Sequence, residues 1–187
     1  GVSGDIGAQF VTDAAYTDTQ TNDTVTNVVI MSAFGRERTT TETVTMMGTL
    51  CHELGHALGL PDLYSTTTGS GGIGDWGLMG TGNYHGRPQG DSPAWQDAWS
   101  RLYLGWAETV VISTDTSVTI TKAESDSRIY KIQVHAASGQ DTEYFLFEVR
   151  VSTGSGYDSA PGKGMLIWHI DSPLGRFANN NVNSVSV

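Results

Sequence analysis

The stretch that most constrains this chain is residues 43–62, which reads TVTMMGTLCHELGHALGLPD. It contains His52 and His56 four positions apart, with Glu53 directly after the first histidine, which is the HExxH pattern. Residues four apart on a helix lie on one face, with their β-carbons about 5–6 Å apart. Two imidazoles at this spacing can converge on one metal ion, and histidine nitrogen is a ligand that zinc accepts. The pattern therefore predicts a zinc-binding helix.

The same stretch carries signals for the ends of this helix. Thr39 and Glu42 have the spacing of a capping box. Gly59 is placed to end the helix in a left-handed conformation, and Pro61 prevents the helix from resuming. An apolar stripe at steps of three and four residues is expected to be buried while the histidines face elsewhere: Val44, Met47, Cys51, Leu54 and Leu58.

Two acidic residues complete the pattern. Glu53 can face the open coordination position without being a ligand, and there it can accept a proton from the water that the metal activates. The turn after the helix can bring Asp62 towards the metal as a third ligand. An aspartate after a proline can equally form an Asx-type turn, and Asp75 and His85 are the alternative ligands in that case.

The motif resembles that of a known family. HELGHALGLPD matches HExxHxxGxxD, the metzincin zinc motif with aspartate in place of the usual third histidine. Residues 74–80 (GDWGLMG) look like the Met-turn of that clan. Residues 144–150 (YFLFEVR) and 161–171 (PGKGMLIWHID) resemble later blocks of the immune inhibitor A-like metallopeptidases, which are secreted bacterial zinc endopeptidases. The resemblance runs from roughly residue 28 to residue 171.

This resemblance implies a function and a set of roles. One catalytic zinc ion would be held by His52, His56 and Asp62, with Glu53 as general base in the hydrolysis of peptide bonds. Met79 would form the hydrophobic floor beneath the metal. The substrates would be proteins or peptides, and the location would be extracellular.

One family feature does not carry over. Many metzincins place a tyrosine two residues after the methionine of the turn, where this chain has Thr81. Tyr84 and His85 are nearby donors, and we consider them as candidate stabilisers of the transition state.

Composition narrows the class of partner. The formal net charge of −10 and the pI of about 4.7 disfavour a nucleic-acid partner. No apolar run approaches the roughly 18 residues of a membrane span. The single cysteine, Cys51, excludes an internal disulfide. Calcium oxygens could come from Asp13, Asp18 and Asp23, but their spacing fits no EF-hand loop. The sequence does not indicate an oligomeric state.

The pattern along the chain predicts an α+β fold of metzincin type. We expect one catalytic domain over residues 1–187, with a zinc-helix and Met-turn half at 1–105 and a β-rich half at 106–187. The chain begins at Gly1 without a methionine, as a trimmed or processed piece would. A second helix is expected from Ser92-Pro93 to Gly105. Strands are expected at 27–34, 109–112, 117–121, 128–134, 143–151 and 164–170.

Two other functions fit parts of the same pattern. One is an adhesion or binding module whose zinc site is structural or shielded, which a closed set of four protein ligands would favour. The other is an amidase or deacetylase acting on non-peptide substrates, which hydrolysis of small acyl amides but not of casein would favour.

Overall fold

The structure, a computed structural model, describes residues 9–11, 16–17, 20, 24–25, 28–30, 47–65, 69–134, 143–151 and 158–171. These residues form an α+β arrangement. The helical elements are α1 (Met47–Ala57), the short 3-10 helices η1 (Gly74–Trp76) and η2 (Thr81–Tyr84), and α2 (Ala98–Tyr103). The strands are β1 (Gln9–Val11), β2 (Tyr16–Thr17), β3 (Thr24–Val25), β4 (Val28–Ile30), β5 (Glu108–Val111), β6 (Arg128–Val134), β7 (Glu143–Val151) and β8 (Lys163–Asp171).

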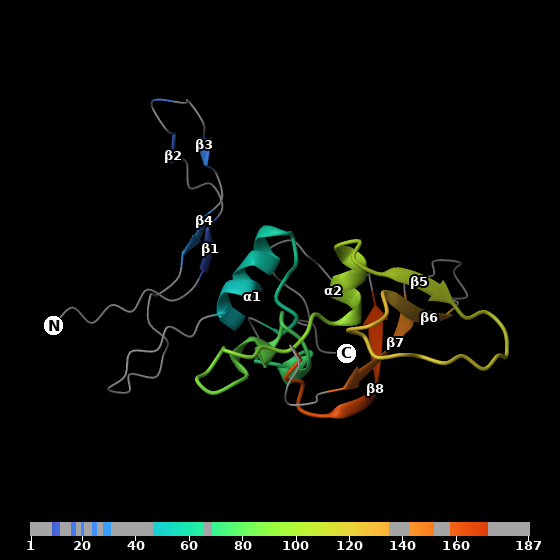
Figure 1. Cartoon of the computed structure of the whole chain (residues 1–187). Coiled ribbons are helices and arrows are strands. Elements are labelled where there is room, and N and C mark those ends of the chain that lie inside the picture. Colours follow the sequence, from blue (N-terminus) through green and yellow to red (C-terminus); the bar gives the residue numbers. More distant parts are fainter. Residues whose placement is uncertain are drawn as a thin grey trace.

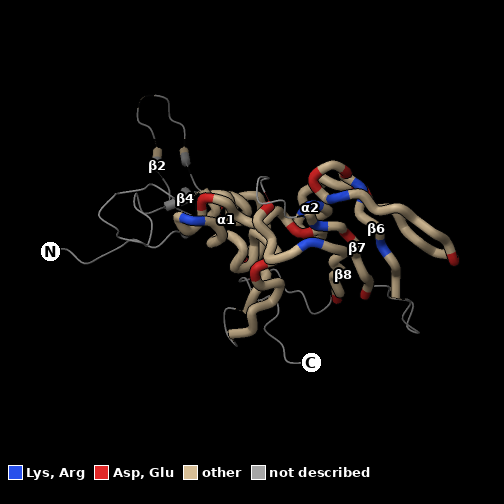
Figure 2. The backbone as a smooth tube through the Cα atoms, turned by 60° about the horizontal axis from the view of Figure 1, so that its bottom comes forward, with Lys and Arg blue, Asp and Glu red and all other residues tan. Residues whose placement is uncertain are grey.

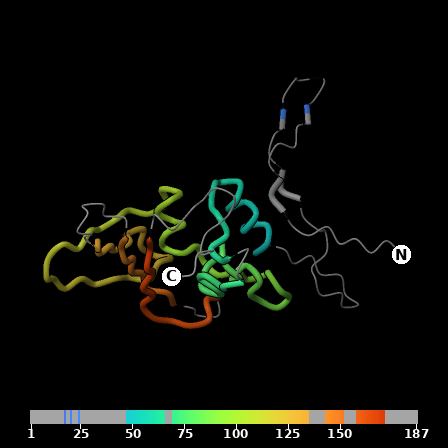
Figure 3. The backbone as a smooth tube through the Cα atoms, turned by 180° about the vertical axis from the view of Figure 1, so that it is seen from behind, coloured from blue at the N-terminus to red at the C-terminus, as the bar shows by residue number. Residues whose placement is uncertain are grey.

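The elements follow one another across the molecule. The N-terminal strands β1 and β4 lie beside α1, and α2 lies between α1 and the sheet of β5 to β8 (Figure 1). The view from behind shows the same order, with the loop after α1, in green, lying below α1 (Figure 3). Within the part of the chain that the structure describes, no helix is long and apolar enough to cross a membrane.

The four-stranded sheet has the order β5-β6-β7-β8, with β5 parallel to β6 and the other neighbours antiparallel. One face packs against α2, where Ala98, Ile129 and Leu146 form a buried apolar cluster. From Leu146 to Arg150, every second residue of β7 is buried, because successive side chains of a strand point to opposite faces. The buried ones are Leu146, Glu148 and Arg150, so this face carries charged side chains into the interior.

Most of the expected strands are confirmed. Those at 128–134 and 143–151 correspond to β6 and β7, and those at 109–112 and 164–170 correspond to β5 and β8 with ends shifted by one residue. The strand expected at 117–121 is wrong: within the described part of the chain, this segment joins none of the sheets. Only Lys122 makes an isolated bridge, to Val149. Of the strand expected at 27–34, β4 is described and pairs with β1, and residues 31–34 lie outside the described part.

The second helix begins later than its sequence predicts. Asp97, not Ser92, is the N-cap, and its carboxylate accepts a hydrogen bond from the Ser100 amide at 3.0 Å. An aspartate caps a helix as well as a serine does, so the prediction of the start at Ser92 is wrong by one and a half turns. The expected stop is confirmed, since Gly105 has φ +70° just after the helix ends.

The face of α1 that is buried is not the one its apolar pattern predicts. Met47, Leu54 and Leu58 are exposed and Cys51 is half-buried. The buried positions of α1 are Gly48, His52, Glu53 and Gly55. Val44 and the capping box of Thr39 and Glu42 lie outside the described residues.

Glycines explain why this face of α1 is buried in place of the apolar one. The Gly48 amide donates to the Gly90 carbonyl at 2.7 Å, and a Cβ on Gly48 would lie 1.9 Å from the Asn83 carbonyl oxygen. A loop backbone can approach a helix this closely only along glycine positions. The histidine face of α1 is therefore covered by the loop that follows, while its larger apolar side chains stay outside.

Candidate metal centre

The chain turns sharply at the end of α1. The Leu60 amide donates to the Gly55 carbonyl at 3.0 Å, and the Gly59 amide donates to the His56 carbonyl at 2.9 Å. This pair of bonds is the Schellman motif, and Gly59 has the positive φ, +95°, that the motif requires. The predicted helix end is thus confirmed, and the reversal carries Asp62 back beside the helix.

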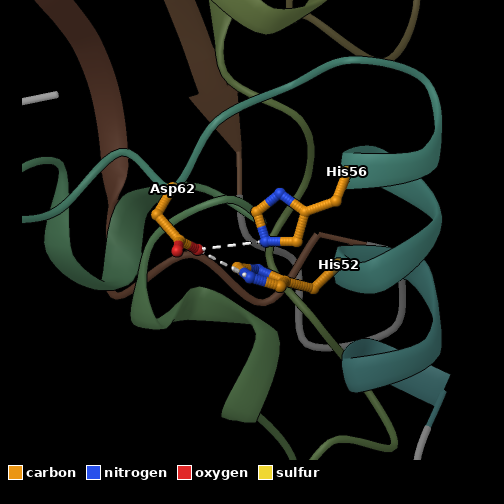
Figure 4. Close-up of side chains that lie close together, drawn as sticks. All are labelled: His52, His56 and Asp62. Atoms are coloured by element: carbon orange, nitrogen blue, oxygen red, sulfur yellow. Dashed lines mark hydrogen bonds and ion pairs between the residues drawn. The ribbon is translucent and has the colours of Figure 1, made fainter. Parts of the chain in front are cut away.

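Three side chains meet at this turn. His52 Nε2 lies 2.9 Å from Asp62 Oδ1, and His56 Nε2 lies 3.2 Å from the same oxygen (Figure 4). His52 and Asp62 are buried and His56 is partly buried. The ligand atoms of the three lie within 4.8 Å of one another. Around a tetrahedral zinc ion with bonds of about 2.0–2.1 Å, neighbouring ligand atoms would be about 3.3 Å apart, so the group fits such an ion with little adjustment.

The other ring nitrogen of each histidine fixes its tautomer. His52 Nδ1 lies 2.8 Å from the Leu78 carbonyl, and His56 Nδ1 lies 2.8 Å from the Leu60 carbonyl. A carbonyl oxygen can only accept, so each Nδ1 must carry the proton. In the neutral rings the two Nε2 atoms then present lone pairs, which is the arrangement seen when outer hydrogen bonds orient metal-ligating histidines.

Three acceptors therefore face one point. Two Nε2 lone pairs and the Asp62 carboxylate repel one another unless a proton or a cation lies between them. Burial lowers the pKa of His56, but its bonds to Asp62 and to the Leu60 carbonyl outweigh burial and raise that pKa overall. Burial raises the pKa of Asp62, but the two histidines outweigh it and hold that pKa well below its usual range. The group has the electrostatics of a cation site.

Glu53 follows His52 on α1 but is not one of the three residues whose ligand atoms come together. Its side chain is buried, and its charge contributes to raising the pKa of His56. The carboxylate is thus near the centre, where the sequence predicts a general base.

The loop after α1 is fixed against the helix by Met79. Met79 is fully buried, and a Cβ on Gly55 would lie 2.5 Å from its Sδ, so the methionine packs directly against α1. The Leu63 amide donates to the Met79 carbonyl at 2.8 Å. This bond ties the segment just after Asp62 to the loop, and so fixes the carboxylate relative to the helix.

The alternative ligands lie elsewhere. His85 Nδ1 lies 2.8 Å from the Ser159 carbonyl, and its Nε2 lies 3.9 Å from Asp75 Oδ1. Asp75 accepts a hydrogen bond from Thr81 at 2.6 Å and is exposed. Among the described residues, the group of three that could hold a metal is made by His52, His56 and Asp62, without these two. Tyr84 is 44% exposed.

One residue of the site escapes the sequence pattern. The Tyr64 hydroxyl donates a hydrogen bond to the Asp62 carboxylate. Burial, together with the charge of Asp62, raises the pKa of Tyr64, so the hydroxyl keeps its proton and stays a donor. The only signal in the sequence is the position of Tyr64 two residues after Asp62, and no motif predicts its contact.

A helix with two converging histidines and a carboxylate just past its end defines a domain of the HExxH metallopeptidase class. Residues 7–107 match the model of the family described as immune inhibitor A peptidase M6, catalytic domain. Because this match covers more than half of the chain, the chain belongs to the immune inhibitor A peptidase family. The resemblance that the sequence motifs indicate is thereby confirmed.

Curated relatives match over a shorter stretch. The pre-pro-metalloprotease PrtV of Vibrio cholerae serotype O1, from strains M66-2 and ATCC 39315 (El Tor Inaba N16961), is 39% identical over 59 residues. The aligned part is 30% of this chain and 6% of PrtV, so the chain spans a small share of the length of these relatives. No solved structure matches the chain significantly.

Proposed function

We propose that this domain is a zinc-dependent endopeptidase, with His52, His56 and Asp62 as the zinc ligands and Glu53 as the general base. The observation that carries the proposal is the meeting of three acceptor atoms at one buried point, with both histidine tautomers set by main-chain carbonyls. Such a set of lone pairs suits a divalent cation. Two imidazoles with one carboxylate make up a zinc ligand set in which a fourth position stays open.

When bound, zinc would polarise the carbonyl of the scissile peptide and acidify the attacking water. Glu53 would accept a proton from that water as its oxygen bonds to the carbonyl carbon. It would then return the proton to the amide nitrogen as the C–N bond breaks. With zinc at their Nε2 atoms, His52 and His56 would be neutral ligands that keep their Nδ1 protons and donate them in hydrogen bonds to the Leu78 and Leu60 carbonyls. Tyr84 and His85 remain candidates for contact with the transition state.

We also propose the metzincin type of fold for this domain. The HExxHxxGxxD pattern and the packing of buried Met79 against Gly55 of α1 support it. Met79 would then be the hydrophobic floor of the centre.

The proposed setting is bacterial and extracellular, with proteins or peptides as substrates. Family membership supports peptide substrates. The relative described as a pre-pro-metalloprotease supports an exported enzyme. One domain over residues 1–187 remains our expectation for the organisation of the chain.

A casein digest tests the proposed function. Purified chain is incubated with casein alone, with a chelator, and with the chelator followed by excess zinc. We expect cleavage in the first sample, loss in the second and recovery in the third. Zinc-loaded protein that hydrolyses small acyl amides but leaves casein intact would favour the amidase alternative. Zinc-loaded protein that hydrolyses neither would favour a binding module.

A further inference from the structure

A second group of buried charges lies where α2, β7 and residues 158–160 meet. It consists of four residues, each no more than 5% exposed, which we call the arginine cluster: Arg101, Glu148, Arg150 and Asp158. Basic and acidic positions lie close together around α2 and β7 (Figure 2). Burying a charge is costly unless it is paired, so the contacts of each member indicate what the cluster holds in place.

Arg150 uses all five of its N–H donors inside the protein. Nε and Nη2 donate to the two carboxylate oxygens of Asp158 at 2.7 and 2.6 Å, and Nη1 donates to Glu148 at 3.3 Å. The two remaining donors reach main-chain carbonyls, that of Trp76 at 3.2 Å and that of Trp95 at 3.3 Å. Because a guanidinium is a rigid fork, the carboxylates fix the direction in which it holds these two carbonyls.

The Trp76 carbonyl is close to the metal centre along the chain. Trp76 ends η1, and two residues later the Leu78 carbonyl accepts the Nδ1 proton of His52 at 2.8 Å. The next residue, Met79, packs against α1. Arg150 therefore holds the main chain two residues away from the carbonyl that orients a proposed ligand.

The segment after β7 holds the other side of the same loop. Asp158 Oδ1 accepts from the Trp95 amide at 3.0 Å. The Ser159 hydroxyl donates to the Ser92 carbonyl, and the Ser159 carbonyl accepts from His85 Nδ1 at 2.8 Å. The loop that covers the histidine face of α1 is thus anchored at four residues, Trp76, His85, Ser92 and Trp95, to residues beyond position 107, where the family match ends.

We propose that Arg150, held by Asp158, is a positioning residue for the metal centre. It would fix the loop at Trp76 so that the Leu78 carbonyl stays in place to orient His52. This inference rests on the proposed function, because it assumes that His52 binds the metal. On this proposal, the residues that support the metal centre include Arg150 of the C-terminal sheet, which is not part of the zinc motif.

The arginine cluster contains a matched control. Arg101 is also buried and donates to Glu148 at 2.7 Å, and its other bond is to the Ala123 carbonyl at 3.4 Å. Among the described residues, these side-chain hydrogen bonds of Arg101 do not reach the loop of residues 74–95. Arg101→Lys therefore disturbs the same buried charges without touching that loop.

The test compares Arg150→Lys with Arg101→Lys in the full chain. Lysine keeps the charge but offers a single ammonium, which cannot hold Asp158 and both carbonyls at once. Zinc affinity is measured by competition with a chromophoric chelator, and ligand geometry by the visible spectrum of the Co²⁺-loaded protein. Residues that orient metal ligands typically change affinity by about 10–100-fold, so we expect Arg150→Lys to weaken zinc binding about tenfold and to alter the Co²⁺ spectrum. Arg101→Lys should leave both the zinc affinity and the Co²⁺ spectrum unchanged, even if both variants lose thermal stability.

The proposal is overturned if folded Arg150→Lys binds zinc as tightly as wild type, or if both lysine variants lose affinity equally. If Arg150→Lys does not fold, Asp158→Asn takes its place, since asparagine can still accept from the Trp95 amide while it loosens the guanidinium. A several-fold loss of affinity in Asp158→Asn supports the proposal, and unchanged affinity overturns it. Casein cleavage is assayed on the same samples. If wild type binds zinc but does not cleave casein, the proposed function is contradicted. The role of Arg150 is still decided by comparing the zinc affinities of the variants.

Discussion

The metal centre and the arginine cluster are both buried groups of charged or ionisable side chains, but their charges balance differently. In the arginine cluster two guanidinium groups face two carboxylates, and the pairs Arg101–Glu148 and Arg150–Asp158 are 2.7 and 2.6 Å apart. The candidate metal centre consists of one carboxylate and two imidazoles, whose Nδ1 atoms already donate hydrogen bonds to main-chain carbonyls. Among the described residues, no lysine or arginine belongs to this group.

This difference separates a structural role from a ligand-binding one. A buried group whose own charges cancel is complete, and breaking it should cost folding free energy. A buried group of acceptors without a cation is completed by a ligand, and breaking it should cost ligand affinity. The following four predictions test this comparison, from the largest expected effect to the smallest.

The largest effect is expected from Glu53→Gln. Glutamine keeps the size of the side chain but cannot accept the proton, so turnover of casein should fall by about 10²–10⁴-fold. Zinc content should stay at the wild-type value, because the proposed ligands are unchanged. Both are measured on the same samples, by proteolysis and metal analysis. Equal cleavage by variant and wild type would remove Glu53 from the mechanism.

The next prediction pairs two carboxylate-to-amide changes. Glu148→Gln leaves two buried guanidinium groups with one carboxylate, so urea unfolding should show a loss of about 3–5 kcal/mol, with or without zinc. With chelator present, Asp62→Asn should lower the free energy of unfolding by less than Glu148→Gln does, because Asp62 is not paired with an arginine or lysine of the site. It should instead abolish most of the stabilisation that zinc gives to wild type. If the two variants behaved alike in both conditions, the two clusters would not differ in the way we describe.

A smaller effect is expected where the loop meets α1. Gly48→Ala would place a Cβ 1.9 Å from the Asn83 carbonyl oxygen, so the loop backbone must shift. Overpacking of this kind typically costs about 1–3 kcal/mol. Gly71→Ala is the control, because a Cβ there meets nothing within 4 Å and Gly71 has no positive φ. A thermal melt in which Gly48→Ala is no less stable than the control would contradict the close packing of the loop on α1.

The smallest expected effect is a change with pH in the stability difference between Asp158→Asn and wild type. Burial raises the pKa of Asp158, but its bonds to Arg150 outweigh burial and hold that pKa below the ordinary 3.8. A lowered folded-state pKa means that the ionised carboxylate contributes stability above about pH 3.8, which is lost as the pH falls through the folded value. Asp158→Asn should therefore be less stable than wild type at neutral pH, with the gap narrowing below pH 3.8. A gap that is constant from neutral to acid pH would show that the charge of Asp158 does not stabilise the fold.

The meeting of His52, His56 and Asp62 could be predicted from sequence because the three residues are close together in the chain. His52 and His56 share a helix face, and Gly59 brings Asp62 back within a single turn. Only local backbone geometry is needed for that, and the structure has the Schellman bonds and the positive φ that the glycine suggests. The strands β6 and β7 were predictable for a similar reason, because each is a local run rich in β-branched and aromatic residues.

What could not be predicted depends on contacts between distant segments. The apolar stripe of α1 misled because the loop around Asn83 packs on the glycine side of the helix. Arg150 reaches a carbonyl 74 positions away, and no local pattern in the sequence signals such a bond. The segment at 117–121 has strand-like residues, but strand formation also requires a neighbour, which the described structure does not place there.

The central claim is that His52, His56 and Asp62 bind one zinc ion. The most direct test is a zinc titration of the metal-free full chain at neutral pH, beside His56→Ala under the same conditions. We predict one high-affinity zinc per wild-type chain and no such binding in the variant, because one of three ligands is gone while the fold is retained by circular dichroism. Binding of zinc by His56→Ala with the stoichiometry and affinity of wild type would contradict the claim.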